Sequence, residues 1–231
     1  MELLSDIELY FTTSELIQSG GLTLAGEELH HAVNVMRHTI DDTLYVTNGE
    51  GTVFKSEITR ITKSELTAKI IDRNQFNNPY KNIWFCIPLL KNPDRLKFAF
   101  EKCVELGITN FILFTSKHTI SKKVNMEKFQ KITLAAMKQS LRAFLPIIIS
   151  ATIDDIISTS GRKILFDQKS IKIFHGDTDV NETTYFLFWP EGGFDKLEIE
   201  KVNPVNHFSL SSNRLRSETA IIKCACLIKF T

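Results

Sequence analysis

Two arginines stand in a polar turn near the carboxyl end of the chain. An apolar run that ends at Leu210 precedes the turn, and a helical pattern that continues to Phe230 follows it. Arg214 and Arg216 are permanently charged and present several N–H donors in one plane, which suits them to stabilise negative charge on a substrate. Ser217 comes next, at the position expected of a helix N-cap. This turn is therefore the first candidate for a reactive site.

A second junction of the same kind lies upstream. The apolar residues 186–189 run into the turn Pro190-Glu191-Gly192-Gly193. Glycine allows the backbone to approach a ligand closely, although an ordinary turn after the proline explains the same residues. Two strand-to-turn junctions in an α/β pattern predict two loops at the carboxyl edge of one sheet, where open α/β sheets bind ligands.

Several motifs, in this order along nearly the whole chain, resemble one family. The chain is similar to the 16S ribosomal RNA uridine-N3 methyltransferases, which belong to the SPOUT class of S-adenosylmethionine enzymes. The motifs are His30-His31 to Arg37, Lys91 to Gly107, Gln139-Ser140-Leu141-Arg142, Trp189-Pro190-Glu191-Gly192-Gly193 and Leu215-Arg216-Ser217-Glu218-Thr219-Ala220.

The resemblance implies an α/β protein of two domains. Residues 1–73 would form a PUA-like RNA-binding β-barrel, and residues 80–231 a SPOUT methyltransferase domain with a C-terminal trefoil knot. It also implies S-adenosyl-L-methionine as cofactor, 16S rRNA or the 30S subunit as substrate, a homodimer, and a cytoplasmic location.

The same resemblance assigns roles to individual residues. Arg216 is the expected catalytic residue, because a fixed cation stabilises the charge that builds on uracil O2 and O4 when N3 loses its proton. The expected cofactor-binding residues are Phe166, Phe188, Trp189, Pro190, Gly192, Gly193, Leu210, Ser211, Ser212 and Leu215. The expected RNA-binding residues are Arg37, Lys91, Arg95, Lys102, Gln139 and Arg142.

Structural roles explain some of these residues equally well. Leu215 could pack in the core instead of against adenine. Ser217 could cap the last helix, and Glu218 would favour the positive N-terminus of that helix. Alternatively, Ser217 and Glu218 could contact the cofactor or take part in proton transfer.

The chain departs from the family pattern at three places. Trp189 replaces a glycine, Ser211-Ser212 replaces Gly-Pro or Gly-Asn, and Arg214 replaces an aliphatic residue. Two other functions therefore stay open, a related methyltransferase with another RNA target and an RNA-binding module that has lost catalysis. Calorimetry of cofactor binding distinguishes an RNA-binding module that has lost catalysis from the methyltransferases.

The net charge of +1 conceals an uneven distribution. Residues 1–80 hold 6 Lys and Arg against 12 Asp and Glu, residues 81–150 hold 12 against 4, and residues 151–231 hold 10 against 11. A basic middle segment favours an RNA contact there. A solvated basic face is the alternative.

Residues 7–72 read mostly as short strands around one helix. The turn Asn48-Gly49-Glu50-Gly51 predicts a hairpin between two of them. The helix is expected from Gly26 to Arg37, with Leu29, Val33 and Met36 on one side. Short strands separated by turns predict a small barrel.

From residue 83 the pattern changes to alternating strands and helices. This alternation predicts a mostly parallel sheet. The expected strands are 83–89, 110–114, 146–149, 164–166, 185–188 and 208–210, and the expected helices are 94–106, 125–142, 153–158 and 217–230.

The composition excludes several classes of protein. No apolar run is long enough to cross a membrane, and the acidic N-terminus lacks the basic start of a secretory signal. The four cysteines sit in apolar stretches and read as reduced core residues. Adjacent residues on a helix point about 100° apart, so His30-His31 is a poor metal site, and Cys224 and Cys226 would lie on nearly opposite helix faces.

Overall fold

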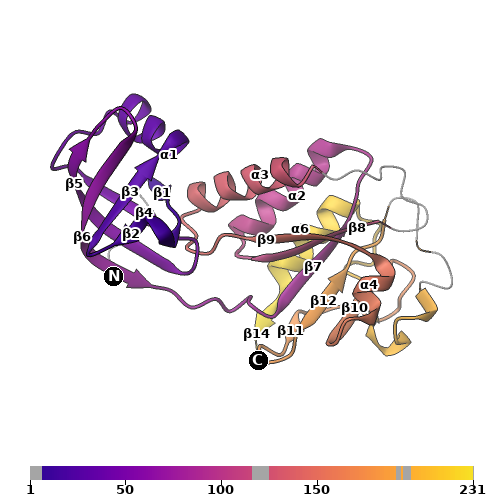
Figure 1. Ribbon diagram of the computed structural model, residues 1–231. Coiled ribbons are helices and arrows are strands. Elements are labelled where there is room, and N and C mark those ends of the chain that lie inside the picture. Colours follow the sequence, from indigo (N-terminus) through magenta and orange to yellow (C-terminus); the bar gives the residue numbers. More distant parts are fainter. Residues whose placement is uncertain (1–6, 116–124, 191–193, 195–198, 231) are drawn as a thin grey trace. The chain divides into compact units, whose positions relative to one another are not determined.

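The computed structural model describes residues 7–115, 125–190, 194 and 199–230. It divides into two compact units (Figure 1). The first consists of Met1–Asn78 and Met137–Leu145, and the second consists of Pro79–Ala136 and Pro146–Thr231. The first unit is therefore built from two separate stretches of sequence.

A six-stranded sheet forms most of the first unit. Its order is β1-β4-β5-β6-β3-β2, with β1 parallel to β4 and the other pairs antiparallel. The Thr12 hydroxyl, just after the edge strand β1, donates to the Thr23 carbonyl of β3 at 2.7 Å, so the sheet curves back on itself around its core. The elements are β1 Leu9–Phe11, η2 Ser14–Leu16, β2 Ile17–Gln18, β3 Gly21–Ala25, α1 Gly26–His30, η3 His31–Val35, β4 Thr43–Thr47, β5 Thr52–Ile61 and β6 Glu65–Gln75.

The predicted hairpin joins β4 to β5. The Asn48 carboxamide oxygen accepts from the backbone N–H groups of Glu50 and Thr52. Gly49 and Gly51 have φ angles of 73° and 99°, in the left-handed region that glycine adopts without strain. The hairpin prediction is confirmed.

The helix expected from Gly26 to Arg37 has a different form. After α1 the chain continues as a π-helix, η3, closed by the Met36 N–H donating to the His31 carbonyl. The wider π turn rotates the following side chains away from α-helical register. Leu29 is buried as expected, but Met36 is 45% exposed and Ala32 is fully buried, so the prediction for Met36 is wrong.

The segment 137–145 belongs to the first unit through backbone pairing. The Gly51 N–H donates to the Ala143 carbonyl at 3.0 Å, and the Leu145 N–H donates to the Gly49 carbonyl at 2.8 Å. The helix predicted to reach Arg142 ends instead at Gln139. Extended pairing with the hairpin loop replaces its last turn.

A parallel six-stranded sheet forms the centre of the second unit, in the order β13-β10-β12-β7-β8-β9. It confirms the predicted alternation of strands and helices. The elements are β7 Ile83–Pro88, α2 Pro93–Glu105, β8 Asn110–Thr115, α3 Met126–Gln139, β9 Ile147–Thr152, α4 Ile153–Ser158, β10 Arg162–Phe166, β11 Asp177–Thr178, β12 Thr184–Leu187, η4 Pro204–Asn206, β13 His207–Phe208, α6 Ser217–Leu227 and β14 Lys229–Phe230.

Capping residues mark the ends of two helices in the second unit. The Asn92 side chain accepts from two N–H groups at the start of α2, and the chain leaves this helix through Gly107 at φ 99°. Thr152 and Asp155 form a capping box at the start of α4. These caps fix the points at which the chain turns back to the sheet.

The C-terminal segment packs closely against residues 172–178. Strand β14 pairs with β11, and the Lys229 N–H donates to the Gly176 carbonyl at 2.7 Å. A Cβ on Gly176 would lie 1.7 Å from the Leu227 carbonyl oxygen. Only glycine therefore fits at this crossing.

Three of the cysteines are core residues, as predicted. Burial raises the thiol pKa of Cys86, Cys103 and Cys224. Cys226 is exposed, so the prediction for this residue is wrong. It lies two positions from Cys224 on α6, and that spacing turns it to the opposite side of the helix.

None of the helices in the described part of the chain is both long enough and apolar enough to cross a membrane. The same residues contain no cluster of three or more His, Cys, Asp or Glu side chains that could hold a metal ion.

Candidate active site

A cavity of about 890 Å³ lies at the carboxyl edge of the parallel sheet. Loops after β10, β12 and β13 form it together with the start of α2. In the sheet β10 lies between β12 and β13, so the two junctions singled out from the sequence flank a third loop. The lining residues are Lys91, Arg95, Phe166, Asp167, Gln168, Lys169, Phe188, Trp189, Pro190, Leu210, Ser211, Asn213, Arg214, Leu215, Arg216, Ser217, Glu218 and Ala220.

Aromatic and aliphatic side chains form an apolar wall of the cavity. Phe166 and Phe188 are buried and stack with ring centroids 5.3 Å apart. Leu210 is buried, and Leu215 is half-buried. The cavity therefore combines an apolar surface with polar loops, as sites for organic cofactors usually do.

Most of the expected cofactor residues meet here. Phe166, Phe188, Trp189, Pro190, Leu210, Ser211 and Leu215 line the cavity. Ser212 is exposed and does not belong to the described lining. Gly192 and Gly193 lie outside the described residues.

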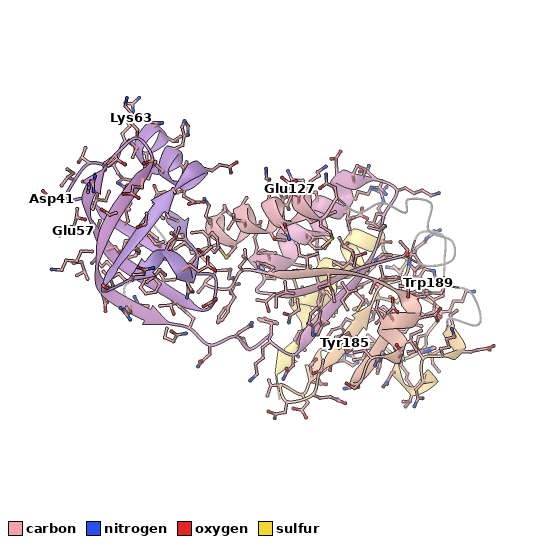
Figure 2. The ribbon with its side chains drawn as sticks, viewed as in Figure 1. Asp41, Glu57, Lys63, Glu127, Tyr185 and Trp189 are labelled. Carbon is pink, nitrogen blue, oxygen red and sulfur yellow. The ribbon has the colours of Figure 1, made fainter. Side chains whose placement is uncertain are left out.

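The departures from the family pattern leave the cavity open. The Trp189 indole packs edge-on against the Phe194 ring, with centroids 5.0 Å apart (Figure 2 labels Trp189). The Ser211 hydroxyl accepts from the Asn213 N–H. Ser211 does not have a positive φ angle. A serine therefore adopts the backbone conformation of this position without strain.

The start of α6 differs from the sequence prediction. Arg216 is the extended N-cap residue, with φ −72° and ψ 154°, and Ser217 is the first helical residue. The Ser217 hydroxyl donates to the Trp189 carbonyl at 3.4 Å. The predicted cap is therefore wrong, because this hydroxyl joins α6 to the loop after β12 instead of accepting from its own helix.

The residues on both sides of Arg216 are tied to other elements. The Gln168 side chain donates to the Leu215 carbonyl at 3.0 Å. The Glu218 carboxylate lies 3.6 Å from Nε of Arg95 on α2. Arg216 itself is exposed, and its guanidinium has no hydrogen bond or ion pair within the described part of the chain. A fixed backbone thus presents an uncommitted cation at the cavity.

The cavity carries an excess of positive charge. Its described lining includes five basic side chains and the carboxylates of Asp167 and Glu218. The basic side chains are Lys91, Arg95, Lys169, Arg214 and Arg216. Such a concave basic surface attracts an anionic substrate.

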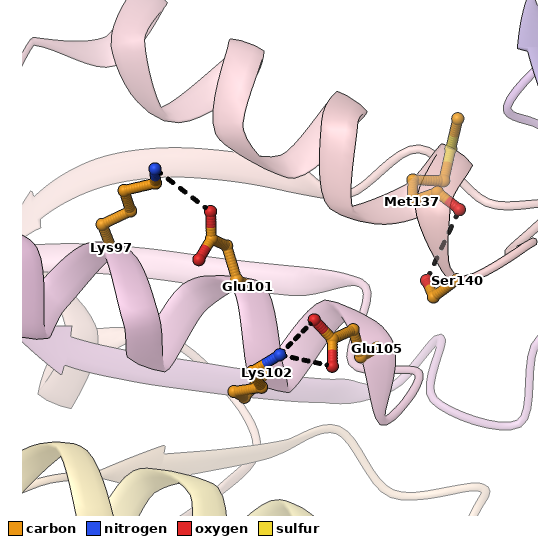
Figure 3. Close-up of polar contacts among 6 residues, drawn as sticks. All are labelled: Lys97, Glu101, Lys102, Glu105, Met137 and Ser140. Atoms are coloured by element: carbon orange, nitrogen blue, oxygen red, sulfur yellow. Dashed lines mark hydrogen bonds and ion pairs between the residues drawn. The ribbon is translucent and has the colours of Figure 1, made fainter.

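The expected RNA-binding residues do not form one group. Lys91 and Arg95 line the cavity, whereas Lys102, further along α2, contacts both Glu105 carboxylate oxygens at 2.6 and 2.9 Å. The Lys97–Glu101 pair on the same helix is a similar ion pair (Figure 3). Acidic neighbours therefore offset part of the basic face predicted for α2.

The other three RNA candidates belong to the first unit. Arg37, Gln139 and Arg142 are exposed. Arg37 has a φ of 62° and Leu141 a φ of 55°, which is uncommon outside glycine. Both lie in tight turns directly after helices.

The sequence reasoning missed the loop after β10. Asp167, Gln168 and Lys169 line the cavity, and the Lys169 N–H donates to the Asp167 carboxylate at 2.9 Å. A signal was available, because the apolar run 164–166 ends in a polar turn as the other two junctions do. Strand order in the sheet, however, cannot be read from the sequence.

Comparison with known proteins identifies the two parts of the chain. A family model described as an RNA methyltransferase domain matches residues 77–229. A model described as an RNA methyltransferase PUA domain matches residues 24–71. These matches confirm the predicted fold class of a PUA domain followed by an α/β methyltransferase domain.

Individual proteins agree with the family models. Ribosomal RNA small subunit methyltransferase E of Rickettsia conorii is 28% identical over 95% of this chain and 93% of its own length. The protein of the same name from Bacillus subtilis is 24% identical with the same coverage. Both relatives span almost the whole chain.

Solved structures share the fold. A probable rRNA-methyltransferase from Porphyromonas gingivalis superposes with a TM-score of 0.81 at 25% identity, covering 95% of this chain and 96% of its own. Ribosomal RNA small subunit methyltransferase E from Neisseria gonorrhoeae, bound to S-adenosyl methionine, superposes with a TM-score of 0.80 at 21% identity and covers 95% of each chain. Together with the family model that spans residues 77–229, these findings show that the chain belongs to the RNA methyltransferase family.

Proposed function

We propose that the protein transfers a methyl group from S-adenosyl-L-methionine to N3 of a uridine in 16S ribosomal RNA. The observation that carries the proposal is the cavity at the carboxyl edge of β13, β10, β12 and β7, with its apolar wall and the uncommitted Arg216 at its border. The relatives named small subunit rRNA methyltransferases support the substrate.

The residues present fit the cofactor. Phe166, Phe188 and Leu210 offer an apolar wall for an adenine ring, while the basic side chains suit a carboxylate. Gly192 and Gly193 stay candidates for close backbone contacts. Bound here, the cofactor supplies an electrophilic methyl group on a sulfonium.

The chemistry asks the protein to stabilise an anion. N3 of uracil becomes a nucleophile only when its proton leaves, and negative charge then spreads to O2 and O4. Arg216 presents a planar set of N–H donors with its backbone already fixed. Donors that are oriented in advance stabilise the transition state more than the ground state.

RNA binding would use both units. We propose residues 1–73 as the RNA-binding domain and residues 80–231 as the catalytic domain, of which residues 137–145 pack in the first unit. Lys91 and Lys102 would contribute from the basic middle segment, and Arg37, Gln139 and Arg142 from the first unit. Arg95, the remaining candidate, faces Glu218 instead. Phosphate contacts of this kind make affinity fall as salt rises.

We also propose the remaining family features for this chain, namely the trefoil knot, the homodimer and the cytoplasmic location. Backbone pairing supports the knot. Within residues 172–178, the Lys172 carbonyl accepts from the Ser209 N–H, and the Phe174 N–H donates to the Ser209 carbonyl. The Gly176 carbonyl accepts from the Lys229 N–H. Residues 172–178 are therefore paired both with the chain before α6 and with the chain after it. This pairing is what we expect where a helix passes through a loop.

Nucleoside analysis tests the proposal. Ribosomal RNA from a strain that lacks the gene is digested to nucleosides and analysed by mass spectrometry, with wild-type and complemented strains beside it. Loss of one N3-methyluridine, restored by the wild-type gene, is the expected result. Fragmentation places the methyl group on the base or on the ribose. An unchanged N3-methyluridine content would refute the proposal.

A further inference from the structure

The geometry points to the Arg95–Glu218 ion pair as a device that positions Arg216, and this inference rests on the proposed function. Arg95 was expected from the sequence to bind RNA. In the structure its guanidinium faces a carboxylate within the cavity lining. We infer that Arg95 and Glu218 are positioning residues for the reaction.

The pair joins the first turns of two helices. Arg95 is the third residue of α2, and Glu218 is the second residue of α6. Nε and Oε1 lie 3.6 Å apart, the Glu218 side chain is 12% exposed, and the Arg95 side chain is 39% exposed, so the carboxylate is the shielded partner. Opposite charges interact more strongly at a site shielded from water than on an open surface. The pair therefore restrains the first turn of α6, two residues from Arg216.

Two neutral contacts complete the support around Arg216. The Gln168 side chain donates a hydrogen bond to the Leu215 carbonyl, and the Ser217 hydroxyl donates one to the Trp189 carbonyl. The Arg95–Glu218 ion pair is the charged member of these three contacts, and it is the one that joins α6 to α2. Loss of the pair should let the first turn of α6 shift, and with it the guanidinium of Arg216.

This arrangement separates two possible roles of Arg95 by their kinetics. A phosphate contact stabilises bound RNA before and during the reaction alike, so its loss raises KM. A positioning residue acts on the transition state through Arg216, so its loss lowers kcat while KM for RNA stays nearly constant. Glu218, an anion, has no favourable contact to offer a phosphate.

A double-mutant cycle tests the inference with 30S subunits as substrate. The variants are Glu218→Gln, Arg95→Met and the double variant. We expect each single change to lower kcat about tenfold, the scale of a coupling near 1.4 kcal/mol. KM for RNA should stay within about twofold, and the double variant should be no slower than the slower single variant.

Glu101→Gln is the matched control. It neutralises the acidic partner of Lys97 on the same helix α2, outside the described cavity lining (Figure 3). Its kcat should equal that of the wild type. Calorimetric binding of S-adenosylmethionine to each variant confirms that the cavity has folded.

Two results would overturn the inference. In the first, Arg95→Met raises KM and lowers the slope of log affinity against log salt by about 1, while Glu218→Gln leaves kcat unchanged; Arg95 is then a phosphate contact. In the second, the effects of the single changes on kcat add fully in the double variant. An inactive wild-type protein would instead refute the proposed function on which the inference rests.

Discussion

Replacement of Arg216 by alanine is the sharpest test of the active-site assignment. Arg216 is exposed at the cavity, its neighbours are held by Gln168, Trp189 and Arg95, and its guanidinium has no partner in the described part of the chain. Removal should therefore disturb no folded contact and should delete one preorganised charged donor. Such a loss costs about 2.7–4 kcal/mol of transition-state stabilisation, or roughly 10²–10³ in kcat.

The assay is single-turnover methylation of 30S subunits with labelled S-adenosylmethionine. Cofactor affinity, measured by calorimetry, should change little in Arg216→Ala. Arg216→Lys should recover only part of the rate, because an ammonium lacks the planar arrangement of donors. Raising the pH should restore part of the activity of the alanine variant, since the uracil anion then forms in solution.

Arg214→Ala provides the matched control, because Arg214 is also an exposed arginine of the cavity lining. It should keep most of the wild-type rate. If Arg216→Ala turns over at a near-normal rate at neutral pH while Arg214→Ala does not, the reasoning has assigned the wrong arginine.

Three further predictions concern stability. Gly176→Ala should destabilise the protein by roughly 3 kcal/mol or more in urea unfolding, because its Cβ would overlap the Leu227 carbonyl; an unchanged midpoint would contradict the close crossing. Lys138→Met should destabilise the first unit, because it leaves Glu28, whose side chain is 15% exposed, without the cation 2.5 Å away; Lys131→Met, which breaks an exposed pair, should have little effect. Raising the pH from 7.5 to 9.5 should destabilise the second unit, whose unfolding both tryptophans report. Burial raises the pKa of three thiols, so the native state keeps protons that the unfolded state loses above pH about 8.5, and each thiol should cost about 1.4 kcal/mol at pH 9.5. These are the thiols of Cys86, Cys103 and Cys224. A stability that does not change over this pH range would refute their burial.

Local signals in the sequence were enough to predict the class of the fold and to place the candidate site at two turns. Local signals were sufficient for the hairpin at residues 48–51, for α2 with its terminal Gly107, and for the alternating strands and helices, because propensity and hydrophobic period act over a few residues. The turns at 190–193 and 209–216 could be assigned to one sheet edge, since consecutive parallel strands end on the same side.

Which residues become neighbours in space depends on tertiary packing. Insertion of β10 between β12 and β13 brought Asp167 into the cavity, and strand order depends on packing of the whole sheet. The α-helical period of the sequence likewise did not predict the π turn that leaves Met36 exposed. Arg95 was predicted from the sequence to bind RNA because its partner, Glu218, is distant along the chain. The packing of α6 against α2 sets the two charges 3.6 Å apart, and the energy of a charged side chain depends on the groups that surround it in space.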